Sequence, residues 1–208
     1  MPADLIFVID ESGSVGQDHF DDTMKALSKT VDKLAIGEDL IQVGMSLFGG
    51  TDTSRTRFDL NASYNKTEIK TMVTGTSYNK KGYTNIDDAL RYACEDMFVL
   101  RKGDRPKVKD YLILLTDGKS NRGNIMTGVA KCTSRNVSII AVGIGDGIDE
   151  QELRSIVDKP EYYFNTTYTE LNEALPDLVT KSLDCSAGIC LVNTLRASFV
   201  LAKFIEVF

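Results

Sequence analysis

The sequence predicts an α/β fold: a Rossmann-like, doubly wound, mostly parallel six-stranded sheet with one antiparallel edge strand and helices on both faces. Apolar runs without strict alternation occur at residues 5–9, 41–48, 111–115 and 137–142. Such runs are typical of strands that are covered on both faces, as in a parallel sheet. Segments of helical periodicity lie between them, and an alternation of strand and helix is the pattern of the α/β class.

The first helix is expected between the first two strands, because Phe20, Met24 and Leu27 recur at helical spacing. We expect it to begin near Asp18, whose negative charge stabilises the positive end of the helix dipole. Gly37 is the expected end of this helix.

The antiparallel edge strand is predicted at residues 53–60, where Phe58 and Leu60 alternate with polar neighbours. Two glycines, Gly49 and Gly50, would form the turn that joins it to the second strand. The remaining elements follow from periodicity and length, and they are a helix containing Ile86, Leu90, Ala93 and Met97, a helix at 149–157, a strand at 162–164 and a last helix at 169–183.

The 208 residues are enough for one domain with a sizeable core, which we expect to span residues 1–184. The tail, residues 185–208, does not fit this plan, because it is apolar on nearly every side at helical spacing. Its charged residues make it a poor membrane span. It is an extra helix, an interaction segment or sequence foreign to the domain, and these three alternatives remain open.

A net charge of -6 argues against a nucleic-acid partner, because such binding requires a basic surface. No signal peptide is visible, yet four asparagines lie in acceptor motifs for N-linked glycans, which favours a secreted or cell-surface glycoprotein. These acceptors are Asn61, Asn65, Asn136 and Asn165.

Three oxygen-bearing side chains, Asp10, Ser12 and Ser14, alternate in the turn after the first strand. The strand at 111–115 is followed by Asp117, and Thr84 precedes the helix expected from Ile86 onward. Loops at the carboxyl ends of parallel strands converge where the strand order reverses. Carboxylate and hydroxyl oxygens suit Mg²⁺, with Mn²⁺ or Ca²⁺ as alternatives, so we predict a metal site formed by these side chains.

Each of these pieces also has an ordinary structural interpretation. Ser14 is a candidate cap of the first helix, and Thr84 is a candidate cap of the next one, with Asp87 completing a capping box. Asp117 and Gly118 could be a simple strand exit. The occurrence of all three pieces together favours the metal site. His19 is expected near the rim of this site, as a surface residue without chemistry.

Together these motifs resemble the von Willebrand factor type A domain with its metal-ion-dependent adhesion site (MIDAS), over residues 4–183. The resemblance implies direct coordination of the ion by Ser12, Ser14 and Thr84, and indirect coordination through water by Asp10 and Asp117. The motifs, in chain order, are Asp10-Glu-Ser12-Gly-Ser14, Gly82-Tyr-Thr84-Asn-Ile and Thr116-Asp117-Gly.

The resemblance implies an extracellular adhesion module of the matrix-protein or surface-adhesin kind. Its bound Mg²⁺ would capture an acidic side chain of a matrix or cell-surface protein, with a glycan partner and self-association as alternatives. An intracellular type A domain that acts in assembly is the second hypothesis. A Mg²⁺-dependent phosphohydrolase of the haloacid dehalogenase kind is disfavoured, because Ser12 stands where that family needs a second aspartate. We therefore expect no enzyme activity.

The four cysteines leave disulfides or buried thiols open, and the absence of a Cys-x-x-Cys pair disfavours a zinc site. Cys94 and Cys132 would approach each other if their helices cover the same face of the sheet. Cys185 and Cys190 would close a small loop after the last helix or pair elsewhere.

Overall fold

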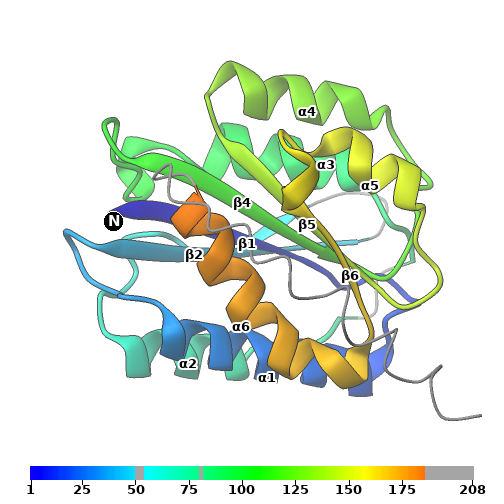
Figure 1. Cartoon of the computed structure of the whole chain (residues 1–208), viewed down its shortest axis with the longest axis horizontal. Coiled ribbons are helices and arrows are strands. Elements are labelled where there is room, and N and C mark those ends of the chain that lie inside the picture. The colour runs from blue at the N-terminus through cyan, green and yellow to red at the C-terminus, as the bar shows by residue number, and fades with distance from the viewer. Residues whose placement is uncertain (50–53, 80–81, 186–208) are drawn as a thin grey trace, which may run out of the picture.

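The computed structural model describes residues 1–49, 54–79 and 82–185. They fold into three layers, with one sheet between two layers of helices (Figure 1). This arrangement confirms the predicted α/β class.

The described residues form one sheet of six strands in the order β3-β2-β1-β4-β5-β6. All neighbouring strands are parallel except β2 and β3, which confirms the predicted antiparallel edge. The first strand pairs with β2 on one side and β4 on the other, so the strand order reverses there. The strands are β1 (Ala3–Asp10), β2 (Ile41–Phe48), β3 (Arg55–Phe58), β4 (Lys109–Thr116), β5 (Ser138–Ile144) and β6 (Tyr163–Thr166).

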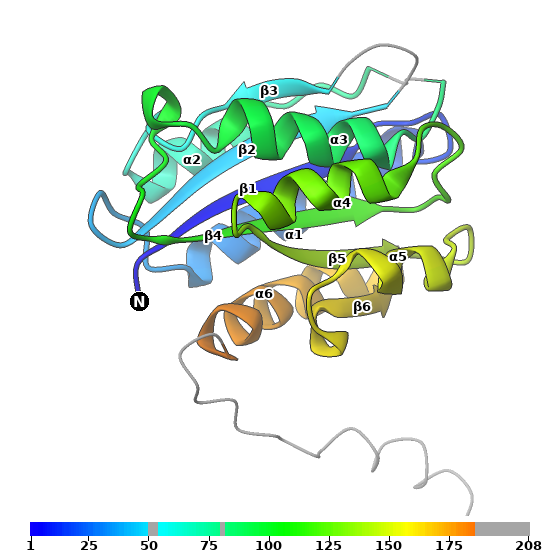
Figure 2. The same ribbon diagram turned by 90° about the horizontal axis from the view of Figure 1, so that it is seen from above.

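Helices α1, α2 and α6 cover one face of the sheet, and α3, α4 and α5 cover the other (Figures 1 and 2). Side chains of β1 alternate between the two cores: Leu5, Phe7 and Ile9 pack with α1 and α6, whereas Ile6 and Val8 pack with α3 and α4. The helices are α1 (Gly16–Lys33), α2 (Lys66–Thr74), α3 (Ile86–Tyr92), α4 (Ile125–Ser134), α5 (Glu150–Ile156) and α6 (Tyr168–Cys185).

Several boundaries differ from those expected. Helix α1 ends at Lys33 rather than Gly37, because the backbone of Leu34 is already extended. Helix α3 does not continue to Met97 in regular form, since a π-helical turn (Ala93–Met97) follows it. Strand β3 is shorter than predicted, and Gly50 and residue 53 lie outside the described residues.

Helix α2 was not predicted. It buries only Ile69 and Val73, so its apolar periodicity is weak over a short length. A polar signal marks its start instead, because Asn65 Oδ1 accepts hydrogen bonds from the backbone N–H groups of Thr67 and Glu68.

Helices α3 and α4 are joined covalently and by close packing. Cys94, in the π-helical turn after α3, forms a disulfide with Cys132 of α4, and both side chains are buried. The backbone N–H of Gly128 donates to Asp87 Oδ1 at 2.8 Å, and a Cβ atom on Gly128 would lie only 2.7 Å from the Asp87 carbonyl oxygen. The two helices can approach this closely because residue 128 is glycine.

The remaining sequence features lie on the surface or at the end of the described chain. All four acceptor asparagines, at positions 61, 65, 136 and 165, are exposed. Cys185 is the last residue of α6, and Cys190 lies with the rest of the tail outside the described residues. None of the described helices combines the length and the apolar composition needed to cross a bilayer.

Replacing both Cys94 and Cys132 by alanine is expected to lower the free energy of unfolding by about 2–4 kcal/mol, because the cross-link restricts the unfolded chain. The measurement is equilibrium urea denaturation. Thr133→Ala, a change at the exposed neighbour on α4, is the control and should change the stability by less than about 0.5 kcal/mol. Equal midpoints for the double variant and the unchanged protein would contradict the expectation.

Candidate metal centre

The predicted metal ligands lie at the point where the strand order reverses. Strands β1 and β4 are parallel neighbours, with Ile9 opposite Leu115. The next residues, Asp10 and Thr116, are therefore the last of two adjacent strands, and Asp117 follows directly. Asp10 and Asp117 can lie side by side only if β1 and β4 are neighbouring strands, and the structure contains this strand pairing. Ligand crevices of doubly wound sheets occur at such switch points.

The turn after β1 is held by the side chains of Asp10 and Tyr78, which form hydrogen bonds with its backbone. Asp10 Oδ1 accepts the backbone N–H of Ser12 at 2.8 Å. The hydroxyl of Tyr78 donates to the Ser12 carbonyl oxygen at 2.7 Å and accepts the backbone N–H of Gly16 at 3.1 Å. Gly16 has φ 73°, a conformation that glycine adopts without the steric cost of a side chain. The turn is thereby closed before α1 begins.

Hydroxyl groups connect this turn to β4. Ser14 Oγ donates to Asp117 Oδ1 at 2.8 Å, and Thr116 Oγ1 donates to Asp10 Oδ2 at 2.6 Å. The Ser12 and Ser14 hydroxyls are 3.0 Å apart, and because Ser14 donates to Asp117, Ser12 is the donor between them. The two turns thus form one hydrogen-bonded network.

Thr84 joins the same cluster from the loop before α3. A Cβ atom built on Gly118 would lie 3.4 Å from Thr84 Oγ1 and 3.9 Å from Ser14 Oγ, so the bare glycine leaves room beside both hydroxyls. The backbone N–H of Asn121 donates to the Thr84 carbonyl oxygen at 3.0 Å. The structure therefore brings together all of the predicted ligands, which are Asp10, Ser12, Ser14, Thr84 and Asp117.

The contacts do not support the capping interpretations of Ser14 and Thr84. Helix α1 has Val15 at its N-cap, without a side-chain hydrogen bond, so Ser14 does not cap it. Asn85 caps α3 by accepting from the backbone N–H of Asp88, so Thr84 does not cap that helix. Asp87 completes no capping box, because its Oδ1 accepts from α4. The hydroxyls of Ser14 and Thr84 are left for the cluster.

The burial of the Asp10 carboxyl group favours the binding of a cation by the cluster. Asp10 is only 3% exposed, and burial raises the pKa of its carboxyl group to about 6. Hydrogen bonds from Thr116 and Ser12 oppose this rise, while the charge of Asp117 adds to it. A divalent cation would compensate the two carboxylates, and their oxygens together with three hydroxyls are ligands that hard cations prefer. The residues present therefore fit a hard divalent ion.

Sequence reasoning missed three residues around this cluster: Thr116, Tyr78 and Tyr168. Thr116 is part of a sequence motif but is not among the predicted site residues. Its position at the end of an apolar strand is the signal that places it at the crevice. Burial and then the charge of Asp117 raise the pKa of Tyr168, which interacts with Asp117 from the start of α6. Its ring stacks on His19 with ring centroids 3.8 Å apart, so α6 and α1 meet beside the cluster.

A second group of carboxylates lies at the other end of the sheet, formed by Asp4, Asp104 and Asp110, with oxygens within 4.8 Å of one another. Arg105 neutralises the fully buried Asp4, with Nη2 2.6 Å from Asp4 Oδ1. Asp110 Oδ1 is buried and has no hydrogen-bond partner among the described residues. Burial, and then the charges of Asp104 and Asp4, raise the pKa of Asp110 to about 7. Arg105 accounts for the Asp4 charge, so we assign no ion here.

Asp110→Asn is expected to stabilise the protein at pH 8 and to have little effect near pH 4. The pKa of Asp110 is about 7 in the folded protein and near 3.8 when unperturbed, so folding loses stability as the pH rises through this window. Thermal unfolding at both pH values would measure a gain of about 2–4 °C at pH 8, allowing for partial solvent exposure. The exposed Asp96→Asn is the control, and an equal gain at both pH values would contradict the assignment.

The fold and this cluster define an α/β domain with an oxygen-rich crevice at its switch point. A family model for the von Willebrand factor type A domain matches residues 4–181, and the chain belongs to this family.

Two relatives and one solved structure place the chain among matrix proteins. Matrilin-1 of Homo sapiens is 35% identical over 165 residues, which cover 78% of this chain and 32% of matrilin-1. The collagen alpha-1(XX) chain of Mus musculus is 33% identical over 159 residues, covering 76% of this chain and 12% of the collagen chain. The structure of proximal thread matrix protein 1 from the mussel byssus, with a zinc-occupied MIDAS motif, matches with a TM-score of 0.79 and 28% identity, over 86% of this chain and 47% of that chain.

The chain spans about a third or less of the two curated relatives and about half of the mussel protein. The similarity confirms the predicted extracellular location and the prediction that the chain is not an enzyme. It also sets aside the hypothesis of an intracellular assembly module. A divalent metal in a similar MIDAS supports the ion class, while the particular ion and the partner of this chain remain proposals.

Proposed function

We propose that this chain is a divalent-cation-dependent adhesion module that captures an acidic side chain of an extracellular protein partner through a bound Mg²⁺. The observation that carries the proposal is the convergence of three loops on one crevice, with two carboxylates and three hydroxyls in or beside one hydrogen-bonded network. We propose that residues 1–184 form this module.

The chemistry of the donor set supports a binding role. Ser12, Ser14 and Thr84 are neutral donors that would hold the ion directly, and Asp10 and Asp117 would act largely through water. Because the hydroxyls add no negative charge, the ion would keep much of its positive charge for an acidic group of a partner. Mg²⁺ favours an octahedral oxygen shell, and Mn²⁺ or Ca²⁺ would be accepted by the same oxygens.

Removing a carboxylate is expected to weaken ion binding more than removing a hydroxyl, because the carboxylate supplies the negative charge that compensates the cation. In calorimetric titration with Mn²⁺, Asp117→Ala should abolish measurable binding, and Thr84→Ala should weaken it by about 10–100-fold. Thr84→Ser keeps the hydroxyl and should retain most of the affinity. Asp146→Ala, which removes an exposed carboxylate from the loop after β5, should have no effect. Unchanged Mn²⁺ affinity in Asp117→Ala would refute the proposed site.

Partner capture should depend on the same ion. On an array of matrix proteins and glycans, chelator should remove binding, and Mg²⁺ or Mn²⁺ should restore it. Asp10→Ala should lose the same spots that chelator removes. Binding that persists in chelator would show that capture does not use the ion. Ion-dependent binding to glycans alone would show that the partner is a glycan and not a protein.

A further inference from the structure

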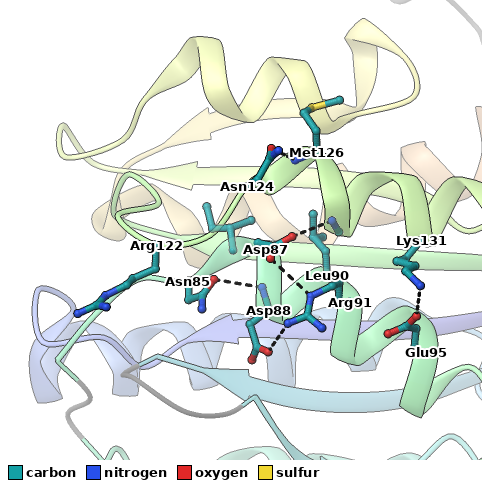
Figure 3. Close-up of polar contacts among 12 residues, drawn as sticks. Asn85, Asp87, Asp88, Leu90, Arg91, Glu95, Arg122, Asn124, Met126 and Lys131 are labelled. Carbon is teal, nitrogen blue, oxygen red and sulfur yellow. Dashed lines mark hydrogen bonds and ion pairs between the residues drawn. The ribbon is translucent and has the colours of Figure 1, made fainter.

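Arg122, in the loop between β4 and α4, carries a charge that no acidic residue of the described chain neutralises. Its guanidinium carbon lies 4.3 Å from the centre of the Tyr83 ring, which is a cation–π distance. The side chain extends away from α3 and α4 (Figure 3). None of the ion pairs found among the described residues includes it.

The carboxylates of the first turn of α3 do not form ion pairs with Arg122, because they already have other partners (Figure 3). Asp87 accepts the backbone N–H of Gly128 at 2.8 Å and pairs with Arg91 Nε at 3.5 Å. Asp88 pairs with Arg91 Nη2 at 3.1 Å, and its other oxygen accepts two hydrogen bonds from Ser54. One arginine thus satisfies both carboxylates from within the helix.

The position of Arg122 is tied to that of Thr84. Tyr83 precedes Thr84 in the chain, and the Asn121 N–H donates to the Thr84 carbonyl oxygen. Ser120 Oγ accepts the backbone N–H of Ile86 at 3.3 Å and donates to the Arg122 carbonyl oxygen at 3.0 Å. The loop that carries the cation is therefore bonded to the loop that carries a proposed metal ligand.

Lys119, on the same loop, differs from Arg122 because it has an acidic partner. Its Nζ lies 2.6 Å from Asp149 Oδ2, so its charge is already compensated. Arg122 instead lies over an aromatic ring, and its guanidinium makes no hydrogen bond found among the described residues, so its N–H donors are free for a carboxylate. Tyr83 is itself 39% exposed, so it holds the arginine at the surface and does not bury it.

We propose that the partner segment carries two acidic side chains: one for the bound ion and a second that Arg122 binds as a fork of two hydrogen bonds. An arginine pre-positioned by a cation–π contact loses less freedom on binding a carboxylate than a mobile one does. The inference rests on the proposed function, because the first acidic group is assigned to the ion. It adds a requirement on the sequence of the partner.

The probes are short synthetic peptides. Each peptide with one glutamate is compared with a series of peptides that carry one additional glutamate, and the distance between the two glutamates differs from one peptide of the series to the next. Binding is measured in Mn²⁺ and in chelator. The best two-glutamate peptide should bind about tenfold more tightly than its one-glutamate match, a difference typical of one charged hydrogen-bonded pair. The Arg122→Gln variant should bind the one-glutamate and the two-glutamate peptide with equal affinity. The Arg122→Lys variant should keep part of the preference for the two-glutamate peptide, because it keeps the charge.

Lys131→Gln is the matched control, because it removes the same charge from a surface ion pair between α4 and Glu95 in the π-helical turn after α3. It should keep the full preference. A preference that survives in Arg122→Gln, that is lost equally in Lys131→Gln, or that is absent from the unchanged protein would overturn the inference. Arg122-dependent binding of a sulfated oligosaccharide in place of the peptides would also overturn it, in favour of a glycan partner.

Calorimetric titration of the same proteins with Mn²⁺ separates the two proposals. Arg122→Gln should bind the ion as the unchanged protein does, since the guanidinium is not a ligand. Failure of the unchanged protein to bind Mn²⁺ would refute the proposed function. Normal ion binding without any two-glutamate preference would refute only the role of Arg122.

Discussion

The buried carboxyl group of Asp10 is the constraint on which the arrangement of the site depends. It ends a strand that is covered on both faces, so the side chain emerges into protein and not into water. A carboxylate in such a place needs hydrogen bonds and positive charge to be stable. Its two oxygens accept from Ser12 and Thr116, and these bonds join the turn after β1 to the end of β4. Compensation of the remaining charge by a cation is the physical basis of the proposed function.

The pairing of α3 with α4 determines the other side of the crevice. The disulfide between Cys94 and Cys132 and the contact of Asp87 with Gly128 hold these helices together. The loops that precede the two helices carry Thr84 and Arg122, and hydrogen bonds join these loops to each other near the crevice. The rim of the site is thus built on a rigid helix pair, which favours a fixed spacing between the ion and a second contact point.

Several charged groups on the described elements near the crevice are compensated by ion pairs. Glu11 is buried and makes two hydrogen bonds with Arg55, which attaches the turn after β1 to the edge strand. Lys119 has Asp149, and Arg91 serves both acidic residues of its helix. A surface of paired charges offers few strong contacts to a wrong partner, so the proposed ion and Arg122 would carry most of the selectivity.

Local patterns in the chain were enough to predict the α/β class and the antiparallel edge strand, and they are the basis of the proposed metal-ligand set. Apolar runs, helical spacing and short oxygen-rich motifs are properties of neighbouring residues, so they can be read without coordinates. The short helix α2 was missed because two buried residues make too weak a periodic signal. The cap of α3 is a local contact between Asn85 and Asp88 that the sequence interpretation assigned to Thr84. Packing decided what no local pattern contains: that Cys94 pairs with Cys132, and that Arg122 has no acidic partner among the described residues. Both outcomes depend on how segments distant in sequence meet on one face of the sheet.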